Sequence, residues 1–151
     1  MRANAFTYAM RGLLYTFRHE ANLRVHLAIA ETVVYVGAVE GISATRWAAL
    51  ALAIALVLSL ELLNTALERA VDLTVGERRS PLAGAAKDVA AGAVLVGATG
   101  AAVVGIVVLG PGLGRFFAYG TRTGGLIGLG LLAVVVLLTF LPRIDKGRGA
   151  P

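Results

Sequence analysis

Two uncharged apolar runs constrain this chain more than any other feature of its sequence. Residues 89–109 form a run of 21, and residues 124–141 a run of 18, without a charged side chain. A helix needs about 20 apolar residues to cross the hydrocarbon core of a bilayer. Of the 151 residues, 58% are hydrophobic and only 15% are charged, which is too apolar for a soluble domain of this length. The sequence therefore predicts an all-α membrane protein.

Two weaker apolar segments precede these runs. Residues 25–39 are interrupted by His26 and Glu31, and residues 47–60 lead directly into Glu61. Both segments can span a bilayer if their polar side chains face protein rather than lipid. We expect spans at about 25–42, 47–72 and 87–109, followed by a fourth C-terminal transmembrane helix within residues 110–151, which end in a basic tail.

An amphipathic helix is expected before the first span. Apolar residues recur there at helical spacing, while the arginines and His19 point elsewhere. We expect this helix to cover about residues 5–22 and to lie on the membrane surface. The apolar residues that define its face are Phe6, Met10, Leu13, Leu14 and Phe17.

The basic residues are distributed unevenly along the chain. Residues 1–24, residues 69–87 and the tail after residue 141 hold eleven Lys and Arg, and the two remaining loops hold three. Because loops rich in Lys and Arg stay in the cytoplasm, we expect a multi-pass protein of the bacterial inner (plasma) membrane with both termini inside. No apolar signal-peptide region follows the first arginines, so we expect the N-terminus to be retained. The scattered charge favours anionic lipid head groups over nucleic acid as partners.

A polar face on the second span is the most informative local pattern. Glu61, Asn64, Glu68 and Asp72 fall within roughly 80° of arc on a helix, so they share one face. A charged group near the bilayer centre costs about 2.5 to 3.5 kcal/mol, so such a face normally meets a cavity, a partner group or an ion. The simpler alternative is that Glu68, Arg69 and Asp72 belong to the solvated end of a long helix.

Two further polar pieces are expected at the same membrane surface. Glu20 lies just before the first span, and Lys87 and Asp88 lie just before the third. Taken alone, the segment around Glu20 looks like an interfacial anchor, and Lys87 could simply extend to the lipid head groups. Together they offer carboxylate ligands for Mg²⁺, a positive charge for phosphates and a base for a hydroxyl, which phosphoryl transfer requires.

These segments resemble the bacterial diacylglycerol kinase and undecaprenol kinase family of small membrane enzymes. The resemblance covers about residues 6–109, which we expect to form a three-span lipid kinase domain within residues 1–109. Beyond it, residues 110–151 are expected to be an addition to the kinase core. The matching motifs are ELLNTALERAVD at 61–72, AAKDVAAGAVLV at 85–96, YAMRG at 8–12 and EANLRVH at 20–26.

The resemblance implies a role for each motif position on the polar face. It implies that Glu61 is the general base for a lipid hydroxyl, with Asn64 and Asp72 supporting the catalytic site. It also implies that Glu20 and Glu68 coordinate Mg²⁺ between the phosphates of ATP.

The resemblance further implies nucleotide contacts and an assembly. Lys87 and Asp88 match a pair that contacts ATP, and Tyr8 matches a nearby aromatic residue. Glu77 would be a further nucleotide contact, although its loop is one residue longer than the family pattern and carries Arg78 and Arg79. A homotrimer with active sites shared between subunits is implied.

The acceptor and one competing function stay open at this point. The motifs at 59–66 and 87–96 look closer to undecaprenol kinases, so we favour undecaprenol over diacylglycerol, which would give phosphatidic acid. Intramembrane carboxylates such as Glu61 and Glu31 also fit a small transporter or channel subunit. Glu31 could instead line a lipid pocket, pair with a cation or be protonated. A purely structural membrane protein would leave the one-sided cluster of polar residues unexplained.

Other catalytic signals are missing from the sequence. It contains no cysteine and no G-x-x-x-x-G-K-[ST] phosphate loop. His19 and His26 are too isolated to define a zinc site, and we expect an interfacial setting for both.

Overall fold

Four α-helices make up the described part of the chain. The computed structural model describes residues 4–76, 80–112, 130, 132–133 and 137. No strand occurs within these residues, which confirms the predicted all-α class. The predicted fourth span falls, with few exceptions, outside the described residues. The helices are α1 Ala5–His19, α2 Ala21–Glu40, α3 Ala44–Val75 and α4 Pro81–Leu109, with a short 3-10 turn at Gly110–Gly112.

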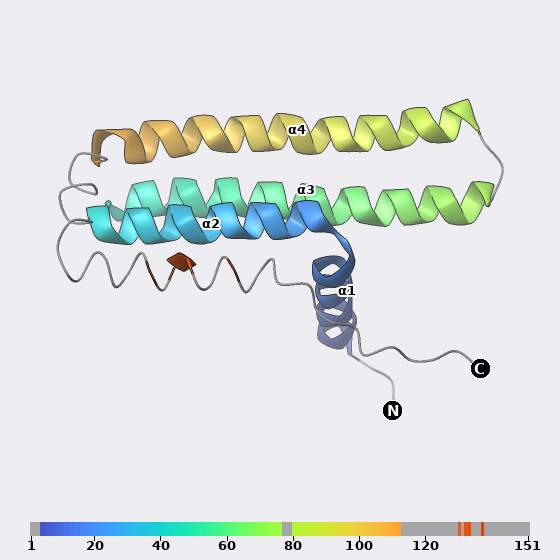
Figure 1. Ribbon diagram of the computed structural model, residues 1–151, viewed down its shortest axis with the longest axis horizontal. Coiled ribbons are helices and arrows are strands. Elements are labelled where there is room, and N and C mark those ends of the chain that lie inside the picture. The colour runs from blue at the N-terminus through green and yellow to red at the C-terminus, as the bar shows by residue number, and fades with distance from the viewer. Residues whose placement is uncertain (1–3, 77–79, 113–129, 131, 134–136, 138–151) are drawn as a thin grey trace.

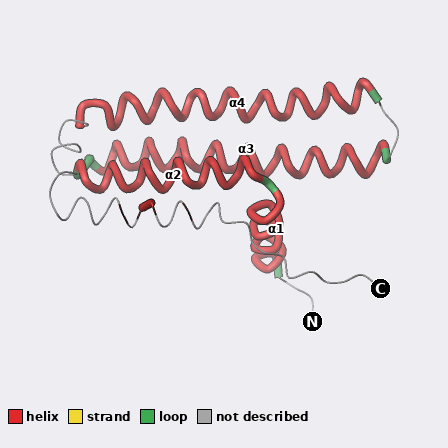
Figure 2. The backbone as a smooth tube through the Cα atoms, viewed as in Figure 1, coloured by secondary structure: helices red, strands yellow, loops and turns green. Residues whose placement is uncertain are grey.

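A single extended residue separates α1 from α2. The side chain of Asn4 caps the start of α1 by accepting from the backbone N–H of Thr7 at 3.0 Å. Glu20 ends the helix with φ −104° and ψ 116°. Arg24 of α2 reaches back and donates to the carbonyl oxygen of Phe17 at 3.1 Å, which satisfies an acceptor that the helix end leaves open. As a result, α1 turns sharply away from the bundle at Glu20 (Figure 2).

Helices α2, α3 and α4 run along one another and form the bundle (Figure 1). α2 ends at Gly41, whose positive φ of 63° is a conformation that suits glycine. α3 has 32 residues, so it is about 48 Å long. This length confirms the prediction that α3 continues past Leu60. Both α3 and α4 extend beyond the start of α2, which leaves a two-helix extension next to α1.

Two helices of the described part are long and apolar enough to cross a membrane. They are Ala44–Val75 and Pro81–Gly112. α2 carries Arg24, His26 and Glu31 and does not meet this measure, so its membrane span stays a prediction. Large apolar side chains on α3 and α4 are widely exposed, which suits contact with lipid or with other helices.

A glycine of α4 packs against a leucine side chain of α3. Gly97 is buried, and a Cβ at this position would collide with the side chain of Leu60. By contrast, a Cβ on the exposed Gly100 would meet open space. Small residues let helix backbones approach closely in membranes, where apolar burial supplies little attraction between helices. The absence of a side chain at Gly97 therefore makes room for Leu60 between α3 and α4.

A leucine at Gly97 is expected to destabilise the bundle. Gly97→Leu must displace Leu60 and push α4 away from α3, at a cost of about 1 to 3 kcal/mol. The measurement is thermal unfolding in detergent micelles, followed by circular dichroism. Gly100→Leu is the matched control and should unfold close to the wild-type temperature. Equal melting temperatures for Gly97→Leu and wild type would contradict this packing.

Candidate active site

Glu61 is a buried carboxylate of α3 that faces the first turns of α2. It is 3% exposed, although charged residues are seldom buried unless they are paired. Its partner is His26 of α2, whose Nε2 lies 3.2 Å from Glu61 Oε1. One helical turn further along α3, the hydroxyl of Thr65 donates to the carbonyl oxygen of Glu61 at 3.0 Å. The structure thus places the predicted base in a defined pocket, beside a histidine from another helix.

Asn64 and Glu68 lie further along the same face of α3, and their side chains are hydrogen-bonded to each other. Asn64 Nδ2 donates to Glu68 Oε1 at 2.9 Å. The amide oxygen Oδ1 of Asn64 is buried and has no hydrogen-bond partner among the described residues. A buried amide oxygen without a donor is available to a cation or to a hydroxyl group.

Glu20 joins this face from the corner between α1 and α2. Arg69 Nη2 lies 3.5 Å from Glu20 Oε1. The Arg69 guanidinium also lies over the ring of Tyr15, at 5.5 Å from its centre, and Tyr15 stacks on His19 at 4.3 Å. Arg69 therefore connects α3 with the end of α1 and orients the Glu20 carboxylate.

The three carboxylates Glu20, Glu61 and Glu68 lie close enough for their charges to interact. Both Glu20 and Glu68 act electrostatically on Glu61. No group of three or more acidic or histidine side chains within the described residues is gathered tightly enough to hold a metal on its own. However, Mg²⁺ usually binds through one or two carboxylates together with substrate phosphates. Glu20, Glu68 and the free oxygen of Asn64 fit that pattern.

Asp72 and Lys87 lie further toward the α3–α4 connection. Lys87 Nζ donates to Asp72 Oδ1 at 2.5 Å, which links α3 to α4 across 15 residues of sequence. Asp72 is 11 residues after Glu61, which is about 16 Å along the helix axis. Asp88 is exposed beside Lys87. The structure therefore places Lys87 and Asp88 at the end of the polar face marked by Asp72, and not beside Glu61.

Tyr8 is not brought to the carboxylates. Tyr8 is 60% exposed and lies 12 residues before Glu20, about 18 Å along α1. Glu77 lies outside the described residues. Their nucleotide contacts stay predictions.

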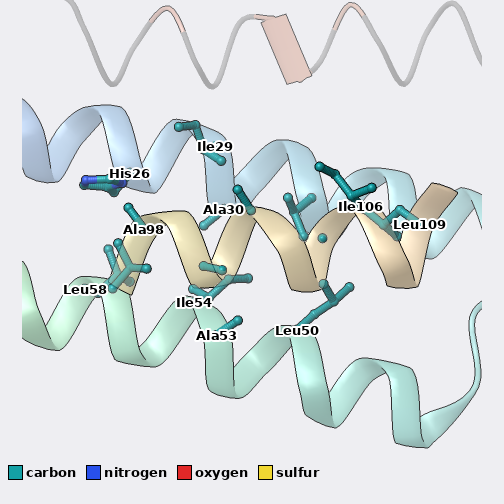
Figure 3. A pocket seen from close by; sticks show the side chains of 15 residues that line it. His26, Ile29, Ala30, Leu50, Ala53, Ile54, Leu58, Ala98, Ile106 and Leu109 are labelled. Carbon is teal, nitrogen blue, oxygen red and sulfur yellow. The ribbon is translucent and has the colours of Figure 1, made fainter. Parts of the chain in front are cut away.

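A polar pocket and an apolar cavity meet at His26. The polar pocket, of about 260 Å³, is lined by Asn22, His26, Glu61 and Asn64 together with apolar residues of α2 and α4. The apolar cavity, of about 310 Å³, lies between α2, α3 and α4. His26 stands at one end of the cavity, with Leu58 and Ala98 nearby, and Ile106 and Leu109 lie at the other end (Figure 3). A molecule with a polar head and an apolar chain matches this pair of spaces.

Sequence reasoning missed two residues of this site. His26 was expected at the interface, and Arg69 was named only in the alternative in which the helix end is solvated. A signal for His26 was available, because Ile29, Ala30 and Val33 follow it at spacings of three, four and seven and line the same cavity. No comparable pattern marks Arg69, since its partners lie on other helices.

The fold and the site define a helical membrane protein in which carboxylates gather beside an apolar cavity. The chain belongs to the prokaryotic diacylglycerol kinase family, whose model matches residues 7–109. This confirms the family predicted from the motifs.

Two named relatives support this assignment. A diacylglycerol kinase of Synechocystis sp. is 46% identical over 109 residues, which cover 72% of this chain and 62% of that protein. An undecaprenol kinase of Bacillus subtilis is 42% identical over 109 residues, which cover 72% of this chain and 88% of that protein. The chain thus spans less than two thirds of the Synechocystis relative. No solved structure matches the chain. Both names are those of lipid kinases, the predicted class of enzyme.

Removal of the Asp72–Lys87 pair is expected to cost little stability. Both side chains are partly exposed, and exposed ion pairs contribute about 0 to 1 kcal/mol. Asp72→Asn and Lys87→Met should each lower the unfolding free energy by less than about 1 kcal/mol. Thermal unfolding of the two single variants and of the double variant in micelles measures how much the ion pair contributes to stability. A loss several times larger would show that the pair is a main attachment between α3 and α4.

Proposed function

We propose that this protein is an ATP-dependent kinase that phosphorylates the hydroxyl of a lipid alcohol in the bacterial plasma membrane. One observation carries the proposal. The buried carboxylate of Glu61 lies in a polar pocket that meets an apolar cavity at His26. A lipid chain in the cavity would present its hydroxyl to Glu61, and membership of the kinase family supports ATP as the phosphate donor.

Glu61 acts in this proposal as the general base. It accepts the hydroxyl proton of the lipid while that oxygen forms a bond to the γ-phosphorus of ATP. The bond between the γ-phosphorus and the bridging oxygen breaks, and ADP leaves with both bonding electrons. The products are a lipid phosphate, ADP and a proton on Glu61, which is then released to water. Burial of Glu61 excludes competing water from the reacting hydroxyl.

Glu20 and Glu68 would hold Mg²⁺ together with the phosphates of ATP. The free Oδ1 of Asn64 beside Glu68 supports this ligand set. When bound, Mg²⁺ would neutralise charge on the phosphates. Arg69 keeps Glu20 oriented toward α3.

Lys87 and Asp88 would contact the nucleotide at the end of the polar face. Lys87 is the cation nearest to that end whose position the structure gives, and Asp72 fixes its ammonium group. A positive charge at this end of the polar face supports binding of the ATP phosphates there.

Undecaprenol is the acceptor that we favour over diacylglycerol. The motifs at residues 59–66 and 87–96 resemble those of undecaprenol kinases more than those of diacylglycerol kinases. In addition, the apolar cavity is a single space along the bundle, which suits one long hydrocarbon chain. We further propose a homotrimer with shared active sites. The exposed apolar surface of α3 and α4 and the distance between Tyr8 and Glu20 within one chain support it.

Glu61→Gln is expected to abolish kinase activity. The amide cannot accept the hydroxyl proton, and a general base contributes about 10²- to 10⁴-fold to the rate. The measurement is Mg²⁺-dependent transfer of γ-phosphate from labelled ATP to a lipid alcohol in mixed micelles. Glu40→Gln is the control, because Glu40 is also buried but lies at the opposite end of α2. Wild-type turnover by Glu61→Gln would overturn the assignment of the base.

Undecaprenol is expected to be phosphorylated faster than diacylglycerol under the same conditions. The comparison uses kcat/KM for each lipid at equal mole fraction in the micelle. A larger kcat/KM for diacylglycerol would reverse the choice of acceptor and leave the kinase assignment intact. Phosphorylation of neither lipid would favour an ion-transporting role for the buried carboxylates.

A further inference from the structure

His26 occupies a position that none of the roles above uses. Its imidazole Nε2 lies 3.2 Å from Glu61 Oε1, and its side chain is only 20% exposed. It is also a residue that lines both the polar pocket and the apolar cavity. A lipid whose chain fills the cavity and whose hydroxyl reaches Glu61 would have to pass directly beside this ring.

The contact constrains both the histidine and the carboxylate. A neutral imidazole carries one N–H, so a hydrogen bond to Glu61 requires the tautomer with the proton on Nε2. Once Oε1 of Glu61 accepts this bond, the second oxygen, Oε2, is the one left to receive the substrate proton. The Thr65 hydroxyl is bonded to the backbone of Glu61 and not to its carboxylate. Orientation of the carboxylate therefore depends on a side chain that comes from α2.

We propose that His26 is a positioning residue that donates its Nε2–H to Glu61 and directs the other carboxylate oxygen at the lipid hydroxyl. The proposal rests on the proposed role of Glu61 as the base. Because the bond joins α2 to α3 where the two spaces meet, it fixes the base relative to the bound chain. A carboxylate that is free to rotate is aligned with the hydroxyl for only a fraction of the time. Loss of the hydrogen bond from His26 should therefore lower kcat.

Two substitutions separate the hydrogen bond from the packing. His26→Leu keeps an apolar side chain of similar bulk and removes the donor. His26→Gln places an amide Nε2 at about the distance of the imidazole Nε2 and restores a donor. We expect His26→Leu to lower kcat by about 10- to 100-fold, as loss of an orienting partner does elsewhere. KM for ATP should change less than about twofold, and His26→Gln should recover most of the lost kcat.

Thr32, which also lies on α2, supplies a control. Its hydroxyl donates to the carbonyl oxygen of Ala28 in the same helix, so Thr32→Val should leave kcat near the wild-type value. On the Glu61→Gln background, His26→Leu should cause no further loss, since residues that act as a unit are not additive. An equal loss of kcat for His26→Leu and His26→Gln, or a full additional loss on that background, would overturn the proposal.

A spectroscopic measurement tests the contact without any turnover. In ¹⁵N-histidine-labelled protein in micelles, His26 should show the Nε2-protonated tautomer, and its ring shifts should change in Glu61→Gln while those of His19 stay constant. Identical His26 shifts in both proteins would overturn the hydrogen bond. If the wild-type protein phosphorylated no lipid alcohol but the shifts changed as expected, the proposed function would fail while the contact stood. If His26→Leu kept the wild-type kcat while Glu61→Gln was inactive, the positioning role of His26 would be overturned. The role of Glu61 as the base would stand.

Discussion

The burial of one carboxylate is the constraint on which the rest of this structure depends. Glu61 lies within a helix long and apolar enough to cross a membrane, yet it is almost entirely buried. An isolated carboxylate in such surroundings is costly, so it requires partners from neighbouring elements. α2 supplies His26, and the corner before α2 brings Glu20 within electrostatic reach. The rotation of α2 against α3 is therefore tied to the chemistry of the site, as well as to apolar packing.

Much of the fold could be predicted from the sequence, because each helix carries its own signal. Apolar length marked α4, and the second span was expected to continue past Leu60 to about residue 72, close to the observed end of α3 at Val75. The family that the motifs predicted was also confirmed. The sharp corner at Glu20 could not be predicted in this way, since it depends on Arg24 closing the end of α1. Such a bond involves two helices and leaves no periodic pattern in either of them.

The candidate site could be predicted only in part. The shared face of Glu61, Asn64, Glu68 and Asp72 follows from the geometry of one helix, and the Asn64–Glu68 bond is a contact along that helix. Contacts between helices depend on how each helix is rotated, which the sequence does not state. This is why the pairs His26–Glu61 and Glu20–Arg69 emerged only from the structure. The free oxygen of Asn64 likewise became visible only once its neighbours were placed.

The one-residue corner at Glu20 has a mechanical consequence. A single extended residue between two helices allows little slack, so a displacement of α1 is passed to Glu20 almost unchanged. If α1 lies on the membrane surface, as its apolar face predicts, the level of the lipid head groups sets the depth of this carboxylate. Bilayer thickness and the crowding of lipids around α1 would then adjust the distance between Glu20 and Glu68. The proposed kinase would then respond to the physical state of its membrane through the backbone that carries Glu20, its proposed metal ligand.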